Sequence, residues 1–152
     1  MKDERLQTSF WLSEFSRSDT ATRKGIENIP SEDALNNIRI VLAPGMQRVR
    51  NVLQVPVNIS SGYRSAALNA TVGGAKNSQH LLGQAADFTA PEFGSPLAIV
   101  KKLALYANFL QFDQLIQEGD WVHISFASGV PRLQILTAHF GEGGTTYTEG
   151  VA

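Results

Sequence analysis

Two histidines and one aspartate constrain this chain more than any other feature of its sequence. His80 and Asp87 lie in SQHLLGQAAD at 78–87, and His123 ends DWVH at 120–123. Catalytic zinc sites commonly use three nitrogen or oxygen ligands and leave a fourth position open, and two imidazoles with one carboxylate match that set. The fold is therefore expected to bring two distant segments to one cleft.

The segments that carry these side chains have the pattern of half-buried strands. Residues 84–89 and 121–126 alternate apolar with polar side chains, which indicates strands that bury one face. In the first strand Asp87 points away from the core that Phe88 enters, and in the second His123 lies on the polar side. The sequence thus predicts that both ligands face the same open side of a sheet.

The other predicted elements are helices and short strands. Ser31 and Ser95 are candidate N-caps, since a serine hydroxyl accepts hydrogen bonds from the first turn of a helix. Apolar residues at steps of three or four predict one amphipathic helix from Ser31 to Leu53, kinked at Pro44. The remaining elements are a strand at 55–60, helices at 65–72 and 95–108, a strand at 112–117, an edge strand at 132–137, and an aromatic segment at 10–15 that packs on the core.

Length and charge limit the possible classes of protein. The chain has 152 residues, of which 43% are hydrophobic, enough for one compact domain. We place this domain at 1–140 and expect a flexible, glycine- and threonine-rich tail at 141–152. The formal net charge of -1 leaves no basic stripe for a phosphate backbone, so nucleic acid is not an expected partner.

The pattern of charged and apolar residues indicates neither an export signal nor a membrane-spanning segment. Its amino terminus, MKDERLQTSF, is charged where a signal peptide is apolar, and no apolar run is long enough to cross a bilayer. We therefore expect synthesis in the cytosol and no membrane partner. The absence of cysteine excludes disulfides and thiolate metal ligands.

A hydrolase with such a cleft also needs a general base. Asp120 is the candidate, but it lies three residues before His123, an odd offset that would put it on the opposite face of a regular strand. We therefore expect Asp120 in a turn that Gly119 redirects. The third histidine, His139, lies outside these segments and is interpreted as a surface or structural residue, with support of the metal site or substrate contact as the alternative.

A longer stretch of the sequence resembles a known family. SGYRSAALNATVGGAKNSQHLLGQAADF at 61–88, followed by GDWVHISF at 119–126, is similar to the zinc D-alanyl-D-alanine carboxypeptidase family, which includes phage endolysins and cell-wall L-alanyl-D-glutamate endopeptidases. The resemblance covers roughly Phe10 to Thr137. It implies the α+β hedgehog/DD-peptidase fold, with a small antiparallel sheet, helices on one side and a zinc cleft on the other.

The same resemblance implies roles for individual residues. One zinc ion per chain would be bound by His80, Asp87 and His123, with Asp120 as the base. Arg64 would bind the oxyanion or a substrate carboxylate. The expected substrate contacts are Arg64, Tyr63, Ser78 and Gln79, although Ser78 could instead only cap its loop.

The function implied is hydrolysis of peptide bonds in bacterial peptidoglycan stem peptides. The resemblance leaves open whether a terminal D-alanine is removed or the stem is cut internally. A single-domain phage or prophage lysin, active on the cell wall after release or carried on a virion, fits the missing export signal. The alternative is a zinc-containing component of a virion or a wall-binding module without catalysis. A monomer is expected.

Overall fold

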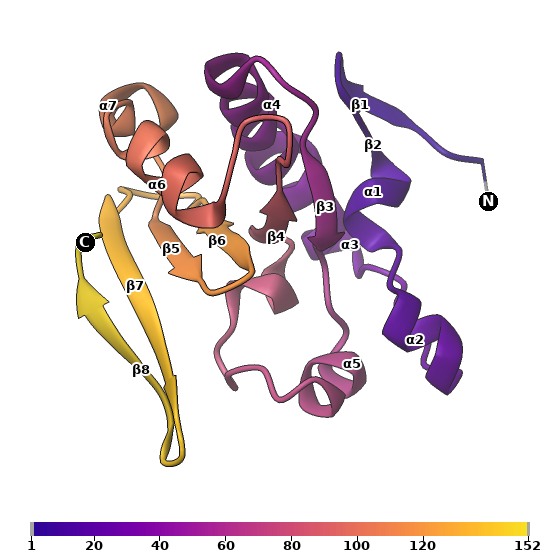
Figure 1. The fold of residues 1–152 in the computed structure, drawn as a ribbon. Coiled ribbons are helices and arrows are strands. Elements are labelled where there is room, and N and C mark those ends of the chain that lie inside the picture. Colours follow the sequence, from indigo (N-terminus) through magenta and orange to yellow (C-terminus); the bar gives the residue numbers. More distant parts are fainter. Residues whose placement is uncertain (1, 152) are drawn as a thin grey trace.

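The computed structural model describes residues 2–151 and organises them around a six-stranded sheet (Figure 1). The strand order is β3-β4-β6-β5-β7-β8, and neighbours are antiparallel except β5 and β7, which are parallel. The strands are β3 (Asn58–Ser61), β4 (Ala85–Thr89), β5 (Gln114–Glu118), β6 (Trp121–Ser125), β7 (Gln134–Gly141) and β8 (Gly144–Glu149). A separate two-stranded sheet pairs β1 (Arg5–Gln7) with β2 (Phe10–Trp11).

In chain order, the helices of the described residues lie between β2 and β5. They are α1 (Leu12–Ser16), α2 (Asp19–Lys24), α3 (Glu32–Asn37), a π-helical turn (Ile38–Leu42), α4 (Ala43–Leu53), α5 (Ala66–Thr71), a 3-10 turn (Gln79–Leu82), α6 (Pro96–Ala104) and α7 (Ala107–Leu110). Ser31 and Ser95 cap α3 and α6 as predicted, through bonds from Ala34 and Ala98. Within residues 2–151, no helix is both long and apolar enough to cross a membrane.

The two faces of the sheet have different surroundings, as the alternation predicted. Ala86, Phe88 and Ile124 enter the main core, which also contains buried side chains of α4 and α6. Asp87 and His123, which are directly paired between β4 and β6, lie on the other face. The alternation of side chains along β4 and β6 therefore places both residues on the side away from the core.

The long helix predicted from Ser31 to Leu53 is built in three parts. A π-helical turn separates α3 from α4, and Pro44 follows it in the first turn of α4. Proline lacks an N–H and is tolerated at a helix start, so the change of winding accommodates it without a break. The apolar stripe stays buried across all three parts, with Ile38, Leu42 and Met46 fully covered.

The C-terminal region differs from the prediction. We expected an edge strand at 132–137 and a flexible tail at 141–152, but β7 pairs along its length with β8, so β7 is not an edge. The two strands form a hairpin that extends away from the helices (Figure 1). Glycines at the turn, including Gly144 at φ +106°, allow it to close, and the threonines and Tyr147 of β8 favour extended backbone.

Candidate metal centre

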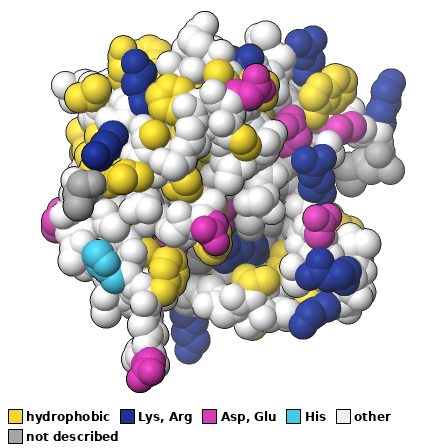
Figure 2. Space-filling model, viewed as in Figure 1, with side chains coloured by type: hydrophobic (Ala, Val, Ile, Leu, Met, Phe, Trp, Pro, Cys, Tyr) yellow, Lys and Arg dark blue, Asp and Glu magenta, His cyan; other side chains and the backbone are white. Residues whose placement is uncertain are grey.

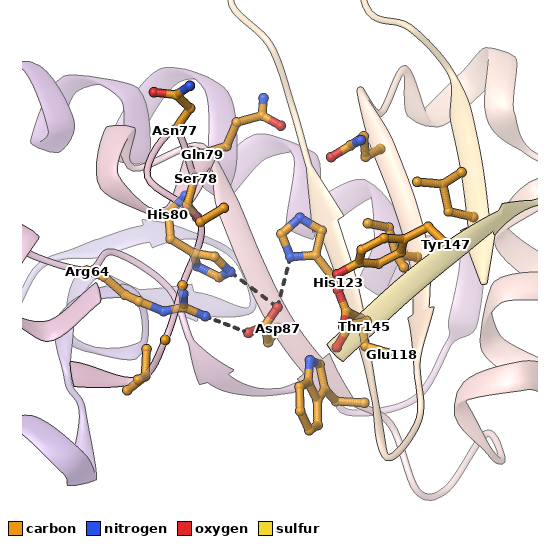
Figure 3. A pocket seen from close by; sticks show the side chains of 18 of the residues that line it. Arg64, Asn77, Ser78, Gln79, His80, Asp87, Glu118, His123, Thr145 and Tyr147 are labelled. Carbon is orange, nitrogen blue, oxygen red and sulfur yellow. Dashed lines mark hydrogen bonds and ion pairs between the residues drawn. The ribbon is translucent and has the colours of Figure 1, made fainter. Parts of the chain in front are cut away.

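Three predicted ligands come together at the open face of the sheet. One ligand atom from each of His80, Asp87 and His123 lies within 4.8 Å of the others. Asp87 and His123 come from adjacent strands, and His80 comes from the 3-10 turn that precedes β4 (Figure 3). The Ser78 hydroxyl accepts a hydrogen bond from the His80 backbone N–H and so fixes the start of that turn. Pairing between β4 and β6 brings Asp87 and His123 together although 36 residues separate them in the sequence.

The hydrogen bonds of His80 leave one of its ring nitrogens available as a ligand. Its Nδ1 lies 2.6 Å from the carbonyl oxygen of Gly62, and because a carbonyl only accepts, Nδ1 carries the proton. Burial lowers the pKa of His80 and outweighs the opposing effect of Asp87, so the ring is neutral at neutral pH. Its Nε2 then presents a lone pair to Asp87 Oδ1 at 3.2 Å. Two acceptors that face each other in this way suit a cation between them.

Asp87 is the centre of the cluster. His123 Nδ1 lies 3.0 Å from Asp87 Oδ1, the same oxygen that His80 faces. Burial alone would raise the pKa of Asp87, but the two neighbouring histidines outweigh it and hold the pKa below its usual value. The carboxylate is therefore ionised over the whole physiological range. Neutral imidazole and ionised carboxylate are the protonation states in which these groups bind zinc.

Arg64 holds the second oxygen of Asp87. Its Nη2 donates to Asp87 Oδ2 at 3.1 Å, while Nε donates to Ser61 and Nη1 donates to Asn69. The Arg64 side chain is 13% exposed, so this network is largely shielded from water. With Oδ2 engaged by the guanidinium, Oδ1 faces the two histidines. Arg64 thus orients a ligand, a role that the sequence did not indicate.

A cavity of about 600 Å³ opens over the cluster. Figure 2 shows one face of the molecule, with a recess near its middle that contains Lys or Arg side-chain atoms. Arg64, Ser78 and Gln79 contribute to one wall, and Ser78 both lines the cavity and caps its turn. The opposite wall comes from the C-terminal half of the sheet and includes Ile116, Glu118, Trp121, Leu136, Thr145 and Tyr147.

Two predicted site residues lie elsewhere in the structure. Tyr63 is only 9% exposed and packs in the main core, because its N–H donates to the carbonyl of Phe15 and fixes its backbone there. Asp120 lies in the exposed turn between β5 and β6, after Gly119 at φ +73°. Among the described residues that line the cavity, neither Tyr63 nor Asp120 is present, although Trp121, next to Asp120, is.

Glu118 is a cavity residue that sequence reasoning missed. It is the last residue of β5, on the same face as Ile116, which is paired with His123. Burial raises the pKa of Glu118, and the hydroxyl of Tyr147 is close enough to hydrogen-bond with its carboxylate. The predicted strand ended at residue 117, whereas β5 extends through Glu118. Extending the alternating pattern of the predicted strand by one residue would have placed Glu118 on the same face as Ile116.

A second arginine reaches the cavity from the segment before β7. Arg132 donates from Nε to Asp113 Oδ1 at 3.1 Å and from Nη2 to Asp113 Oδ2 at 2.7 Å, and its backbone N–H donates to Oδ1 as well. The hydrogen bond from Arg132 lowers the pKa of Asp113 and keeps it ionised. His139, by contrast, is exposed on β7 and bonds to Thr148, consistent with its structural interpretation.

Comparison with known proteins agrees with the geometry of this site. The family model described as peptidase M15 matches residues 8–125. The chain belongs to the peptidase M15 family. Both the predicted family and the predicted α+β fold are confirmed, and membership assigns this peptidase M15 protein to the zinc metallopeptidases. The metal ligands, Arg64 and Glu118 lie inside the matched range, whereas β7 and β8 lie beyond it.

One curated relative of this peptidase M15 protein is the zinc D-Ala-D-Ala carboxypeptidase of Streptomyces albus G. It is 40% identical over 50 residues. Those residues make up 32% of this chain and 20% of the relative, so the chain matches about one fifth of that protein's length.

Proposed function

We propose that this protein is a zinc-dependent peptidase that hydrolyses peptide bonds in the stem peptides of bacterial peptidoglycan. The observation that carries this proposal is the convergence of His80, Asp87 and His123 at the floor of a peptide-sized cavity. The name of the Streptomyces relative supports a substrate that contains D-alanine. The fold by itself is weaker support for this function than the ligand cluster, because one fold can host many different chemistries.

The three ligands fit one zinc ion per chain. Their donor atoms are two imidazole nitrogens and a carboxylate oxygen, and Gly62 and Arg64 bind the atoms that face away from the cluster. A zinc ion in such a set lowers the pKa of bound water and polarises a scissile carbonyl. Residues of the chain must supply the proton transfer and the remaining charge stabilisation.

We assign the proton transfer to Asp120. It accepts a proton from the attacking water and returns it to the leaving amine, which requires an accessible carboxylate beside the reacting bond. Asp120 is exposed in the turn that leads into β6, the strand of His123. Glu118, on the other side of the same turn, is a carboxylate that lines the cavity. A direct comparison of the two residues therefore tests the assignment.

Arg64 contributes positive charge beside the developing oxyanion and holds Asp87. We expect Arg64→Gln to weaken zinc binding by about 10–100-fold, because Asp87 Oδ2 loses its charged partner. Competition with a chelator measures the change. Arg132→Gln is the matched control, since Arg132 lines the same cavity but bonds to Asp113 instead. Equal zinc affinity in the two variants would contradict this role of Arg64.

The identity of the peptide bond that is cleaved is a further part of the proposal. A carboxypeptidase needs a cation for the free carboxylate of its substrate, and Arg64 and Arg132 both line the cavity. Either removal of a terminal D-alanine or cleavage within the stem fits the site. We also propose that the protein acts on the cell wall after release or as part of a virion, as a phage or prophage lysin does.

The experiment that tests the function is mass spectrometry of purified peptidoglycan fragments after incubation with zinc-loaded protein. His123→Ala protein serves as the blank. Free D-alanine would identify a carboxypeptidase, and split stem peptides would identify an endopeptidase. If zinc binds but no product forms from several wall types, the peptidase proposal fails in favour of a wall-binding or virion component.

A further inference from the structure

The wall of the cavity opposite Arg64 has its own chemical character. Glu118 projects from the end of β5, and Tyr147 reaches it from β8 (Figure 3). Trp121 is the cross-strand partner of Glu118 in the β5–β6 hairpin. All three residues line the cavity. A carboxylate is thus accompanied by two aromatic rings at one place on the wall.

Glu118 has no basic partner within residues 2–151. The ion pairs of the described residues involve Glu4, Asp87 and Asp113. Tyr147 lies beside Glu118 at the cavity. A half-buried carboxylate between aromatic rings attracts a cation, since the carboxylate supplies charge and the ring faces supply further electrostatic attraction. Within residues 2–151, no ion pair supplies that cation.

We infer that Glu118, Trp121 and Tyr147 form a subsite for a primary ammonium group of the peptide substrate. The inference rests on the proposed function for its substrate class and concerns which peptides that site accepts. Ammonium suits the subsite because it donates to the carboxylate while its carbon stem packs on the rings. A neutral or acidic group at the same position would leave the Glu118 charge without a partner.

The position of the subsite in the fold indicates that it contributes to the choice of peptide substrate. Tyr147 belongs to the β7–β8 hairpin, which lies beyond the range matched to the family, 8–125. The metal ligands lie within it. The subsite therefore joins a strand of the family fold to a segment outside the match, on the wall across the cavity from Arg64.

The test compares two stem peptides that differ only in one side-chain amine, which is free in one and acetylated in the other. We expect the zinc-loaded protein to bind the free amine at least about tenfold more tightly, by calorimetry, and to show the same preference in KM during hydrolysis. Glu118→Gln should bring the ratio of the two affinities close to one. Tyr147→Leu, at an exposed position, should lower the ratio while leaving Glu118 in place.

Glu142→Gln is the control. It removes an acidic side chain from the tip of the β7–β8 hairpin, outside the cavity lining. Its affinity ratio should equal that of the unchanged protein. An unchanged protein without preference, or a Glu118→Gln variant that keeps it, would overturn the subsite even if hydrolysis proceeds. A clear preference in binding without any hydrolysis would support the subsite and reject the proposed peptidase function.

Discussion

Asp120→Asn is expected to lower the rate of peptide hydrolysis by about 10²–10⁴-fold, the usual contribution of a general base. An amide has nearly the shape of the carboxylate but does not accept the proton of the attacking water. Because Asp120 lies in an exposed turn and outside the ligand cluster, zinc content and folding should remain unchanged. Single-turnover hydrolysis of a stem peptide, with zinc measured on the same samples, gives both quantities.

The matched control for this prediction is Glu118→Gln, measured on the acetylated peptide so that recognition of an amine does not contribute. Glu118 and Asp120 flank Gly119, and both changes remove one negative charge near His123. The loss of kcat should be far larger for Asp120→Asn. The opposite order would transfer the role of base to Glu118 and reject the assignment of Asp120.

His123→Ala is expected to abolish hydrolysis and to weaken zinc binding by well over the roughly 100-fold typical of residues that only support a ligand. His123 lies on the face of β6 that points away from the main core, so the variant should still fold. A ligand that binds only the native state stabilises it by about 2.7 kcal/mol at a concentration 100 times its Kd. Added zinc should therefore raise the unfolding free energy of the unchanged protein but hardly that of the variant.

Urea unfolding with and without zinc measures this difference. His139→Ala is the control, because His139 is exposed on β7 and bonds to Thr148 outside the cluster. It should keep both zinc affinity and zinc-dependent stabilisation. If His123→Ala gained as much stability from zinc as the unchanged protein, the metal would be bound elsewhere.

Local patterns predicted the part of the site that depends on strand alternation. Asp87 and His123 lie on the open face because side chains alternate across β4 and β6, a property that pairing between strands does not alter. Tyr63 shows that a residue next to a site residue in the sequence need not lie at the site. Its neighbour Arg64 lines the cavity, but the approach of Gly62 to the backbone of Phe15 holds Tyr63 in the core.

The opposite wall of the cavity was not predictable in the same way. Glycine and threonine in the last residues suggested a mobile tail, because these residues seldom form a core. The strands form there because β7 pairs in parallel with β5 and offers its other edge to β8, a long-range event without a local signal. Glu118 was missed for a smaller reason, since β5 continues for one residue more than the alternation alone suggested.

The apolar residues of the protein form two clusters of unequal size. The main core includes Phe88 and Ile124, which support the strands of the metal ligands, whereas Ile116, Leu136 and Ala138 form a small separate cluster beneath the hairpin. Substitutions of Leu136 or Ala138, which lie on β7, can shift the hairpin and so alter the width of the cavity, while the packing of Phe88 and Ile124 behind Asp87 and His123 is unaffected. The hairpin is thus a natural place to exchange segments between relatives when the aim is to change substrate choice and keep the metal site intact.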